Sequence, residues 1–372
     1  MPYPPFTLER WFAKHEFSTE HLLCTSDCES MRVSDLLALE PGASLDDVWL
    51  GYTESLGSPR LRASIAALYD GFGPDDILVH VGAQEAIHNF SAGLLQAGDH
   101  VVVHQPAYQS LHAVAEATGC EVTPWIAREA DEWRLDPASL PILLRPNTRA
   151  VFVNTPHNPT GAVIDDGALR QIATTCEDRG IVLFCDEVYR FSERADAGRG
   201  PAACELSPSA VSLGVLSKSF GLAGLRIGWI ATRSRTVLER MREMKDYTTI
   251  CAPSPSEHLA VLALRHRAAI LARTRAVIEH NLELANAFFA RHEQHFLWTP
   301  PRSGPIAFPR LRDGRDADAF CERLVAAHGV LLLPGSVYGA AWRSHFRIGL
   351  GRAAFPAGLA RLEEALALRQ VD

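Results

Sequence analysis

Seven short apolar runs between residues 77 and 232 constrain the fold of this chain more than any other feature. They cover residues 77–81, 101–104, 120–125, 150–154, 181–185, 211–215 and 228–232. The runs are continuously apolar rather than alternating, which is typical of strands covered on both faces of a mainly parallel sheet. Stretches with helical spacing separate several of them, as at 85–95, 111–117 and 168–176. The pattern predicts an α/β fold with a seven-stranded sheet sandwiched by helices.

The two ends of the chain differ from this central region. Helical spacing is present at 8–12, 33–39, 236–247 and 255–291, and the last pattern is long enough to cross between two domains. After residue 300, three short strands (306–308, 330–333 and 346–348) and two helices indicate an α+β unit. A chain of 372 residues also exceeds the usual size of a single core. We expect an N-terminal arm at 1–45 that belongs to a small domain, a large domain at 46–250, and an interdomain helix with a small C-terminal domain at 251–372.

Charge and cysteine usage exclude several classes of protein. The net charge is −8, so the chain lacks the excess basic charge needed to bind nucleic acid or a membrane surface. No apolar run is long enough to span a bilayer and no export signal is visible, which predicts a cytoplasmic protein. The eight cysteines form no CxxC pair, and Cys24 and Cys28 lack a second ligand pair at a matching spacing. We therefore expect reduced cysteines and no metal site.

Polar residues follow several of the predicted strands, where open α/β sheets bind their ligands. Gly82, Ala83 and Gln84 open a helix after the first run, which suits a phosphate but is also an ordinary helix start. Tyr108 follows the second run and either stacks on a flat heterocycle or packs on the core. Asn158 lies in a turn with two X-Pro bonds that allow a cis peptide, and its amide serves either a ligand or the turn.

Two further strand ends carry a charged residue in an apolar context, which indicates a chemical role. A carboxylate at the end of a buried strand, such as Asp186, is costly unless it is paired or caps a helix, and a protonated pyridine nitrogen is a suitable partner. Lys218 lies in an apolar, glycine-rich stretch, although the chain has only three lysines. An amine that forms imines needs desolvation and a nearby cation, and Arg226 supplies a cation that also grips phosphate.

Three motifs together resemble the class I and II aminotransferases, which are pyridoxal 5′-phosphate (PLP) enzymes of fold type I, the aspartate aminotransferase fold. The motifs are NTPHNPTG at 154–161, CDEVY at 185–189 and LSKSFGLAGLRIGW at 216–229. The resemblance extends from about residue 51 to residue 347. It implies PLP as the cofactor, an L-amino acid as the substrate, a small α+β domain beside the large one, and a homodimer whose active sites are shared across the interface.

The resemblance also implies roles for single residues. Lys218 forms the internal aldimine and then acts as the general base at Cα, while Asp186 keeps the pyridine nitrogen protonated. Asn158 and Tyr189 bind the ring hydroxyl oxygen, and Tyr108 stacks on the ring. The phosphate contacts that the resemblance implies come from Gly82, Ala83, Gln84, Ser217 and Arg226.

Three other positions complete the implied site. Tyr52 resembles the tyrosine that reaches the phosphate of the neighbouring subunit. Arg347 resembles the arginine that grips the substrate α-carboxylate, next to Asn158. Val215 departs from the pattern, because many relatives have Ser or Thr three residues before the lysine. We expect one phosphate contact to be lost here or replaced by Gln84 or Ser219.

Three stretches, at 8–11, 216–229 and 333–339, look like the branch of this family that contains capreomycidine synthase. That branch eliminates a hydroxyl group from a hydroxylated arginine and closes a guanidine ring. The likeness makes Glu9, Ser26, Asp27 and Glu29 candidate contacts for a cationic substrate side chain. The alternative is that these residues are ordinary surface and capping groups.

The implied chemistry begins with an external aldimine and a quinonoid at the α-carbon of an L-amino acid. We expect transamination, in amino-acid or secondary-metabolite biosynthesis, as the outcome. Elimination with cyclisation or replacement on a hydroxylated arginine-type amino acid is the alternative. A regulatory, DNA-binding use of the fold is rejected, because the fold starts near the N-terminus and the charge is acidic.

Overall fold

The computed structural model describes residues 3–194 and 198–368, and its centre is a seven-stranded sheet. The strand order is β2-β8-β7-β6-β5-β3-β4, and β8 runs antiparallel to both of its neighbours while the other pairs are parallel. This confirms the predicted fold class, and each predicted run forms one strand. The strands are β2 (Ile77–His80), β3 (His100–Gln105), β4 (Glu121–Ile126), β5 (Thr148–Asn154), β6 (Val182–Asp186), β7 (Val211–Val215) and β8 (Gly228–Ala231).

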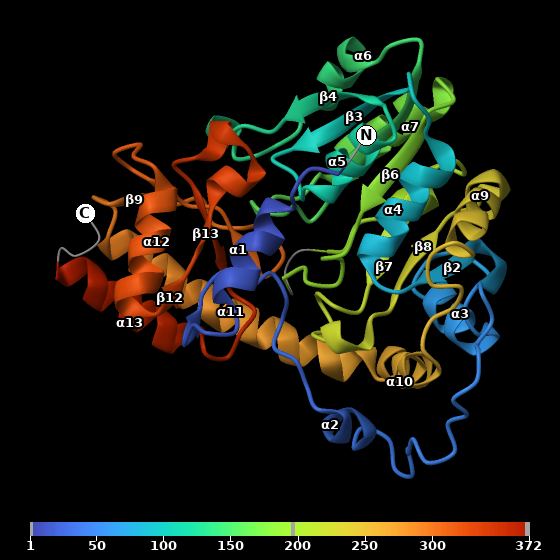
Figure 1. The fold of residues 1–372 in the computed structure, drawn as a ribbon, viewed down its shortest axis with the longest axis horizontal. Coiled ribbons are helices and arrows are strands. Elements are labelled where there is room, and N and C mark those ends of the chain that lie inside the picture. Colours follow the sequence, from blue (N-terminus) through green and yellow to red (C-terminus); the bar gives the residue numbers. More distant parts are fainter. Residues whose placement is uncertain (1–2, 195–197, 369–372) are drawn as a thin grey trace.

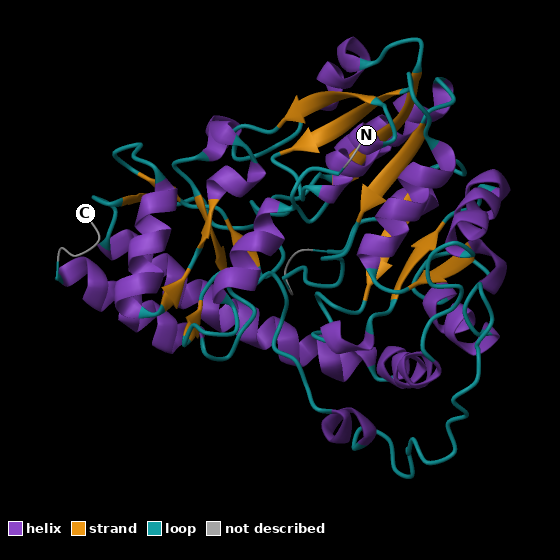
Figure 2. Ribbon diagram, viewed as in Figure 1, coloured by secondary structure: helices purple, strands orange, loops and turns teal. Residues whose placement is uncertain are grey.

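Helices cover both faces of this sheet, as Figures 1 and 2 show. Val101 and Val103 of β3 pack into one apolar cluster with α4, α5 and α9, while Val102 packs into another with α7. Successive strand residues thus bury opposite faces, which explains why the runs are continuously apolar. The helices of this region are α3 (Pro59–Ala66), α4 (Ala83–Leu94), α5 (Ser110–Ala117), α6 (Leu140–Leu143), α7 (Asp166–Asp178), α8 (Ala203–Leu206) and α9 (Arg235–Lys245).

The long helical pattern at 255–291 is two helices, so its prediction as one element was wrong. α10 (Ser254–Arg265) and α11 (Arg267–Arg291) meet at His266, which has φ −98° and ψ 19°. His266 Nε2 lies 2.9 Å from a carboxylate oxygen of Glu40, and Arg265 bonds the same carboxylate. The break thus lies at a contact with a distant residue, and the local pattern carries no sign of it. In Figure 1, α11 runs from the sheet region to the elements at the C-terminal end of the chain.

The C-terminal part forms a separate α+β unit around its own apolar cluster. The expected strand at 330–333 is two strands: β12 (Val330–Leu331) pairs with β1 (His21–Leu22), and β13 (Leu333–Pro334) pairs with β14 (Phe346–Gly349). The chain changes partner between them, which a continuous apolar run does not reveal. The remaining elements are β9 (Phe296–Leu297), β10 (Ile306–Ala307), β11 (Arg310–Leu311), α12 (Ala317–His328) and α13 (Phe355–Ala367).

The N-terminal arm connects the two units through α1 (Thr7–His15) and α2 (Val33–Leu37). The Thr7 backbone N–H donates to Gln109 Oε1 at 2.9 Å beside α5, and Trp11 Nε1 donates to the Leu332 carbonyl at 3.1 Å. One face of α1 is therefore fixed against the sheet unit and another against the C-terminal unit. No helix in the described ranges is both long and apolar enough to cross a membrane.

Candidate active site

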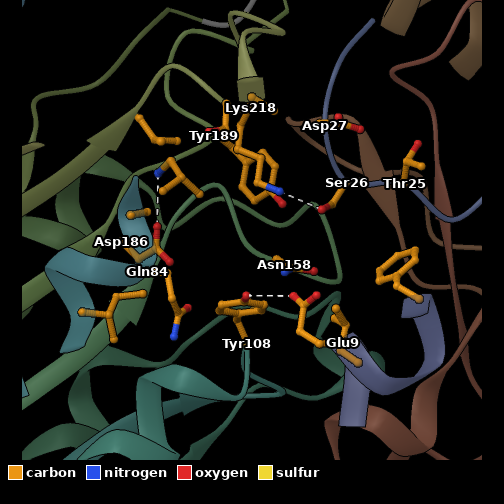
Figure 3. A pocket seen from close by; sticks show the side chains of 18 of the residues that line it. Glu9, Thr25, Ser26, Asp27, Gln84, Tyr108, Asn158, Asp186, Tyr189 and Lys218 are labelled. Atoms are coloured by element: carbon orange, nitrogen blue, oxygen red, sulfur yellow. Dashed lines mark hydrogen bonds between the residues drawn. The ribbon is translucent and has the colours of Figure 1, made fainter. Parts of the chain in front are cut away.

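A cavity of about 580 Å³ lies where the ends of the central strands, the start of α4, the N-terminal arm and β14 converge. Figure 3 shows many of its side chains. Of the predicted site residues, Gly82, Tyr52 and Glu29 do not line the cavity, and neither does Ser219, the predicted replacement for the phosphate contact missing at Val215. Those that do are Glu9, Ser26, Asp27, Ala83, Gln84, Tyr108, Asn158, Asp186, Tyr189, Ser217, Lys218, Arg226 and Arg347.

Lys218 follows β7 in a turn that is tied to β8 by the Leu216 N–H, which donates to Ile227 O at 3.0 Å. Its side chain reaches solvent only in part, and burial lowers the pKa of the amine, with Arg347 acting in the same direction. The ammonium donates to Ser26 Oγ at 2.9 Å. A lysine with a lowered pKa is more readily neutral, so it can attack a carbonyl group and form an imine.

Asp186 ends β6 and is 5 % exposed. Burial raises the pKa of its carboxyl group to about 7, although the Val188 N–H donates to Oδ1 at 3.2 Å. A buried carboxylate of this kind gains from a cationic partner. The protonated ring nitrogen of PLP would be such a partner, so the site fits that part of the cofactor.

Arg226 packs over the start of α4 and forms a cradle for an anion. A Cβ atom on Gly82 would lie 2.3 Å from Arg226 Nη2, so glycine is needed for this approach, and Gly82 has φ +81°. The first N–H groups of α4 have no partner inside the helix, and Ala83 and Gln84 line the cavity there. A guanidinium and free helix N–H groups on one spot suit the phosphate of PLP. Val215 also lines this wall, and its side chain has no polar atom to add.

The amide oxygen of Asn158 is already hydrogen-bonded within the protein. Oδ1 accepts hydrogen bonds from Tyr338 Oη at 3.0 Å and Arg347 Nη1 at 3.2 Å, which leaves Nδ2 as a donor for a ligand. The turn that carries it contains two cis peptides, Thr155–Pro156 and Asn158–Pro159, as the sequence allowed. Tyr108 lies at the same side of the cavity, and its hydroxyl donates to Glu9 at 3.4 Å.

Arg347 enters the cavity from β14 and is 1 % exposed. Its Nη2 and Nε donate to the Cys24 carbonyl at 2.8 and 3.1 Å, and Nη1 donates to Tyr338 Oη at 2.9 Å. Sequence reasoning did not assign Tyr338 to the site. Arg347 is nine residues from Tyr338, but Asn158 is 180 residues away, so no local spacing indicates that Tyr338 meets Asn158. Burial raises the pKa of Tyr338 to about 12, so its hydroxyl stays protonated.

The N-terminal arm supplies three carboxylates to the cavity wall, at Glu9, Glu16 and Asp27. Glu16, the C-cap residue of α1, was missed, although it lies seven residues after Glu9, and this spacing of about two helical turns brings both to the same side. Burial raises the pKa of Glu16, and the charges of Asp27 and Glu9 add to this effect. Arg352 Nη2 pairs with Asp27 Oδ2 at 2.7 Å. Glu29 does not line the cavity, and its carboxylate accepts from the Ala353 N–H at 2.9 Å.

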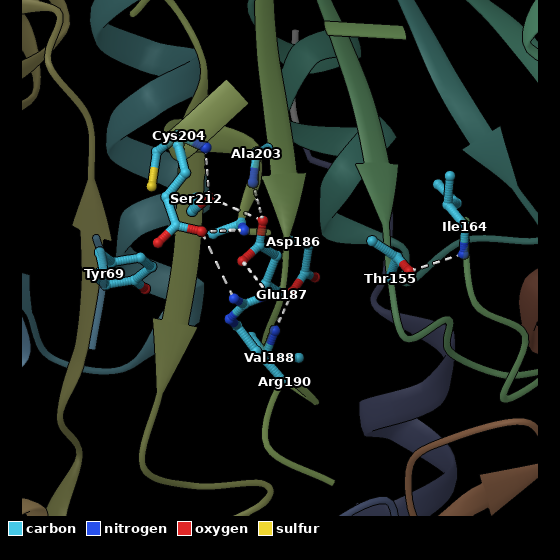
Figure 4. Close-up of polar contacts among 12 residues, drawn as sticks. Tyr69, Thr155, Ile164, Asp186, Glu187, Val188, Arg190, Ala203, Cys204 and Ser212 are labelled. Atoms are coloured by element: carbon cyan, nitrogen blue, oxygen red, sulfur yellow. Dashed lines mark hydrogen bonds and ion pairs between the residues drawn. The ribbon is translucent and has the colours of Figure 1, made fainter. Parts of the chain in front are cut away.

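Glu187 lies behind Asp186 and organises the turn after β6 (Figure 4). Its Oε1 accepts from Ala203 N at 2.7 Å and from Ser212 Oγ at 2.8 Å, and its Oε2 lies 4.0 Å from Arg190 Nη1. The carboxylate is 3 % exposed, and burial raises its pKa. These contacts fix the turn from which Asp186 and Tyr189 reach the cavity.

Tyr52 lies on the surface and is 83 % exposed. Its segment is attached to the start of α10, because Thr53 Oγ1 donates to Ala252 O at 2.9 Å and Ser254 Oγ donates to Trp49 O at 2.7 Å. Within this chain Tyr52 is therefore not part of the cavity.

Comparisons with known proteins agree with this geometry. The model of the family described as aminotransferase class I and II matches residues 21–362. Capreomycidine synthase from Streptomyces vinaceus is 32% identical over 98% of this chain and 94% of its own length. Arginine–pyruvate transaminase from Pseudomonas aeruginosa is 28% identical over 84% of this chain and 82% of its own.

Two solved structures are similar to this one over nearly their whole length. A PLP-dependent aminotransferase from Streptococcus suis has a TM-score of 0.92 and 31% identity, with 100% of this chain and 99% of that chain covered. A PLP-dependent cyclase, OrfR, has a TM-score of 0.91 and 32% identity, with 99% and 98% covered.

Proposed function

The chain belongs to the class I and II aminotransferase family, and from this premise we propose that it acts at the α-carbon of an L-amino acid with a cationic side chain. PLP is the cofactor of this family, and once bound it withdraws electrons from the α-carbon. The Lys218 amine would hold the cofactor and then carry the proton that leaves the α-carbon.

The other residues of the proposed site would bind and orient the cofactor and the substrate. Asp186 would pair with the ring nitrogen, and Tyr108 would stack on the ring. Asn158 Nδ2 and the Tyr189 hydroxyl would bind the ring oxygen, and Arg347 would pair with the substrate carboxylate. The phosphate would rest on the start of α4, with contacts from Gly82, Ala83, Gln84, Ser217 and Arg226.

The observation that carries the substrate proposal is the acidic wall formed by Glu9, Glu16 and Asp27. Figure 3 places Glu9 and Asp27 across the cavity from Asp186 and Gln84, and all of these residues line the same space as Lys218. Carboxylates partly removed from water favour a cation, because a guanidinium forms charge-assisted, bidentate hydrogen bonds with them. The similarity to an arginine–pyruvate transaminase and to capreomycidine synthase supports a substrate of the arginine type.

Transamination is the reaction we propose first, because the chain belongs to the class I and II aminotransferase family and a similar solved structure is that of an aminotransferase. Elimination with cyclisation of a hydroxylated arginine-type amino acid is the second candidate. The observations that favour it are the 32% identity to capreomycidine synthase and the TM-score of 0.91 with a PLP-dependent cyclase. For either reaction we propose a role in amino-acid or secondary-metabolite biosynthesis.

We also propose a homodimer in the cytoplasm. Two neighbouring segments expose large apolar side chains, and a second copy of the chain would cover them and receive Tyr52 near its own phosphate cradle. All eight cysteines are free, which suits a reducing compartment. The exposed side chains are Trp49, Leu50, Tyr52, Tyr247 and Ile250.

A panel of L-amino acids, including arginine and its hydroxylated derivatives, tests the function on the PLP-loaded protein. Pyridoxamine phosphate together with a 2-oxo acid, followed by absorbance and mass spectrometry, would establish transamination. A product lighter by one water, with the cofactor returned to its starting spectrum, would establish elimination and cyclisation. No spectral change with any amino acid would contradict both.

A further inference from the structure

Ser26 makes a contact that a substrate-binding role does not explain. Its hydroxyl oxygen accepts a hydrogen bond from Lys218 Nζ at 2.9 Å, and Figure 3 shows this bond crossing the top of the cavity. The same hydroxyl lies beside the Tyr189 phenol; burial raises the pKa of Tyr189, and Ser26 acts against this rise. Ser26 therefore lies directly against the atom that would form the imine.

The backbone on both sides of Ser26 packs closely against a glycine of the C-terminal unit. A Cβ atom on Gly349 would lie 1.9 Å from Thr25 O, and one on Gly351 would lie 2.3 Å from Asp27 O. Any side chain at either glycine would push this part of the arm away from the cavity. Two close approaches that flank one residue indicate that the position of Ser26 is fixed from both sides.

Hydrogen bonds hold the same segment at its two ends. The Gly349 N–H donates to Leu23 O at 2.7 Å, and the Glu29 N–H donates to Gly351 O at 2.7 Å. The Asp27–Arg352 ion pair adds a side-chain link to the same stretch. Ser26 thus reaches Lys218 from a rigid support rather than from a free arm.

We propose that Ser26 is a positioning residue for Lys218, whose hydroxyl directs the amine while the proton at the substrate α-carbon is moved. With one N–H held by Ser26 Oγ, rotation about the last side-chain bond is restricted, so the lone pair keeps one direction in the cavity. Holding a reacting group in one geometry lowers the entropic part of a barrier. This inference rests on the proposed function for the identity of the reaction, but not for the contact itself.

The contact also predicts a change in the pKa of Lys218, which can be measured without turnover. An acceptor hydrogen bond stabilises the protonated amine, so its removal lowers the pKa of Lys218. The charged and titratable groups around this amine are Asp27 and Cys28 on the arm, Asp186 at the end of β6, Tyr189 in the turn that follows, and Arg347 on β14. Replacing Ser26 by alanine leaves all of these in place.

The test compares Ser26→Ala, Ser26→Thr and the control Ser30→Ala, which makes the same change at an exposed position of the arm outside the cavity. The first readout is the pH dependence of the rate at which added PLP forms its absorbing adduct with the apoprotein. This rate follows the neutral fraction of Lys218 and requires no substrate. The second readout is kcat and KM with the best amino acid of the panel.

We expect Ser26→Ala to move the pH midpoint of PLP loading downwards and to lower kcat about tenfold with little change in KM. Ser26→Thr keeps the hydroxyl and restores both values, and Ser30→Ala behaves as the wild type. A Ser26→Ala protein that loads PLP with the wild-type midpoint overturns the inference, as does a rise in KM with unchanged kcat, which would assign Ser26 to substrate binding. If the wild type accepts no amino acid, the proposed function fails, and the loading measurement still decides the role of Ser26.

Discussion

At the scale of the residue, burial determines the chemistry of Asp186. Its pKa of about 7 lies above the value near 4 of a free Asp, so the folded protein disfavours the charge that the cofactor requires. The folded state binds the proton more tightly than the unfolded state between these two values. The free energy of unfolding of the apoprotein therefore falls as the pH rises from about 4 to about 7.

Asp186→Asn removes this penalty. We expect the stability advantage of the variant apoprotein over the wild type to grow by about 2 kcal/mol from pH 5 to pH 8, because the free energy of unfolding of the wild type falls over this range. Urea unfolding at the two pH values measures the difference. With PLP present the order should reverse, because asparagine cannot pair with the cationic ring nitrogen. A stability difference that is constant with pH would contradict the burial argument.

Single residues of the site differ in how well the sequence predicts them. Lys218, Asp186, Asn158 and Arg226 follow strands or a turn in recognisable motifs, so their neighbourhood follows from the order of the sheet. Tyr338 meets Asn158 from a different unit of the chain, and such contacts leave no local pattern. Glu16 could have been found, because its spacing from Glu9 matches two helical turns.

At the scale of the element, the start of α4 depends on one glycine. Gly82 has φ +81°, and an added Cβ would collide with Arg226 at 2.3 Å. We expect Gly82→Ala to weaken PLP binding by more than about tenfold, through strain in the backbone and displacement of the guanidinium. Equilibrium titration of the cofactor absorbance measures the change.

Gly98→Ala is a matched control for this substitution. Gly98 has a similar φ of +86°, and an added Cβ there meets nothing within 4 Å. It therefore carries the backbone strain without the collision, and PLP binding should stay close to that of the wild type. Equal losses in both variants would mean that strain alone, and not the position of Arg226, explains the effect.

Sequence periodicity predicts the helices and strands only in part. The seven strands were predictable because both faces of the sheet are buried, which produces continuous apolar runs. The break between α10 and α11 lies where His266 meets Glu40, and the division of β12 from β13 lies where the chain changes its partner strand. Both features coincide with tertiary contacts, which the helical or apolar pattern of one segment does not contain.

At the scale of the whole molecule, the cavity is built from the sheet unit, the N-terminal arm and β14 together. The arm and β14 come from opposite ends of the chain, and Arg347 joins them through the Cys24 carbonyl. The domain boundaries near residues 46 and 250 stay predictions.

The proposed homodimer predicts the effect of charges in its exposed apolar patch. Trp49 and Leu50 are 76% and 81% exposed, so a change to Trp49→Glu with Leu50→Glu should leave the fold of the chain intact and yield monomers. Sedimentation velocity measures the oligomeric state. Ile142→Glu is the control, since Ile142 is 85% exposed on α6. A wild-type protein that sediments as a monomer, or a double variant that remains dimeric, would contradict this proposal.

The central claim is that the acidic wall selects a cationic side chain. The most direct measurement compares L-arginine with L-citrulline, its neutral analogue, by the rate at which the α-hydrogen exchanges for solvent deuterium in the PLP-loaded protein. This exchange precedes both candidate reactions. We expect kcat/KM for arginine to exceed that for citrulline by at least about tenfold. Glu16→Gln with Asp27→Asn should remove most of this preference, while Glu29→Gln, outside the cavity, should keep it. Equal rates with the two amino acids, or a preference that survives the double change, would contradict the account.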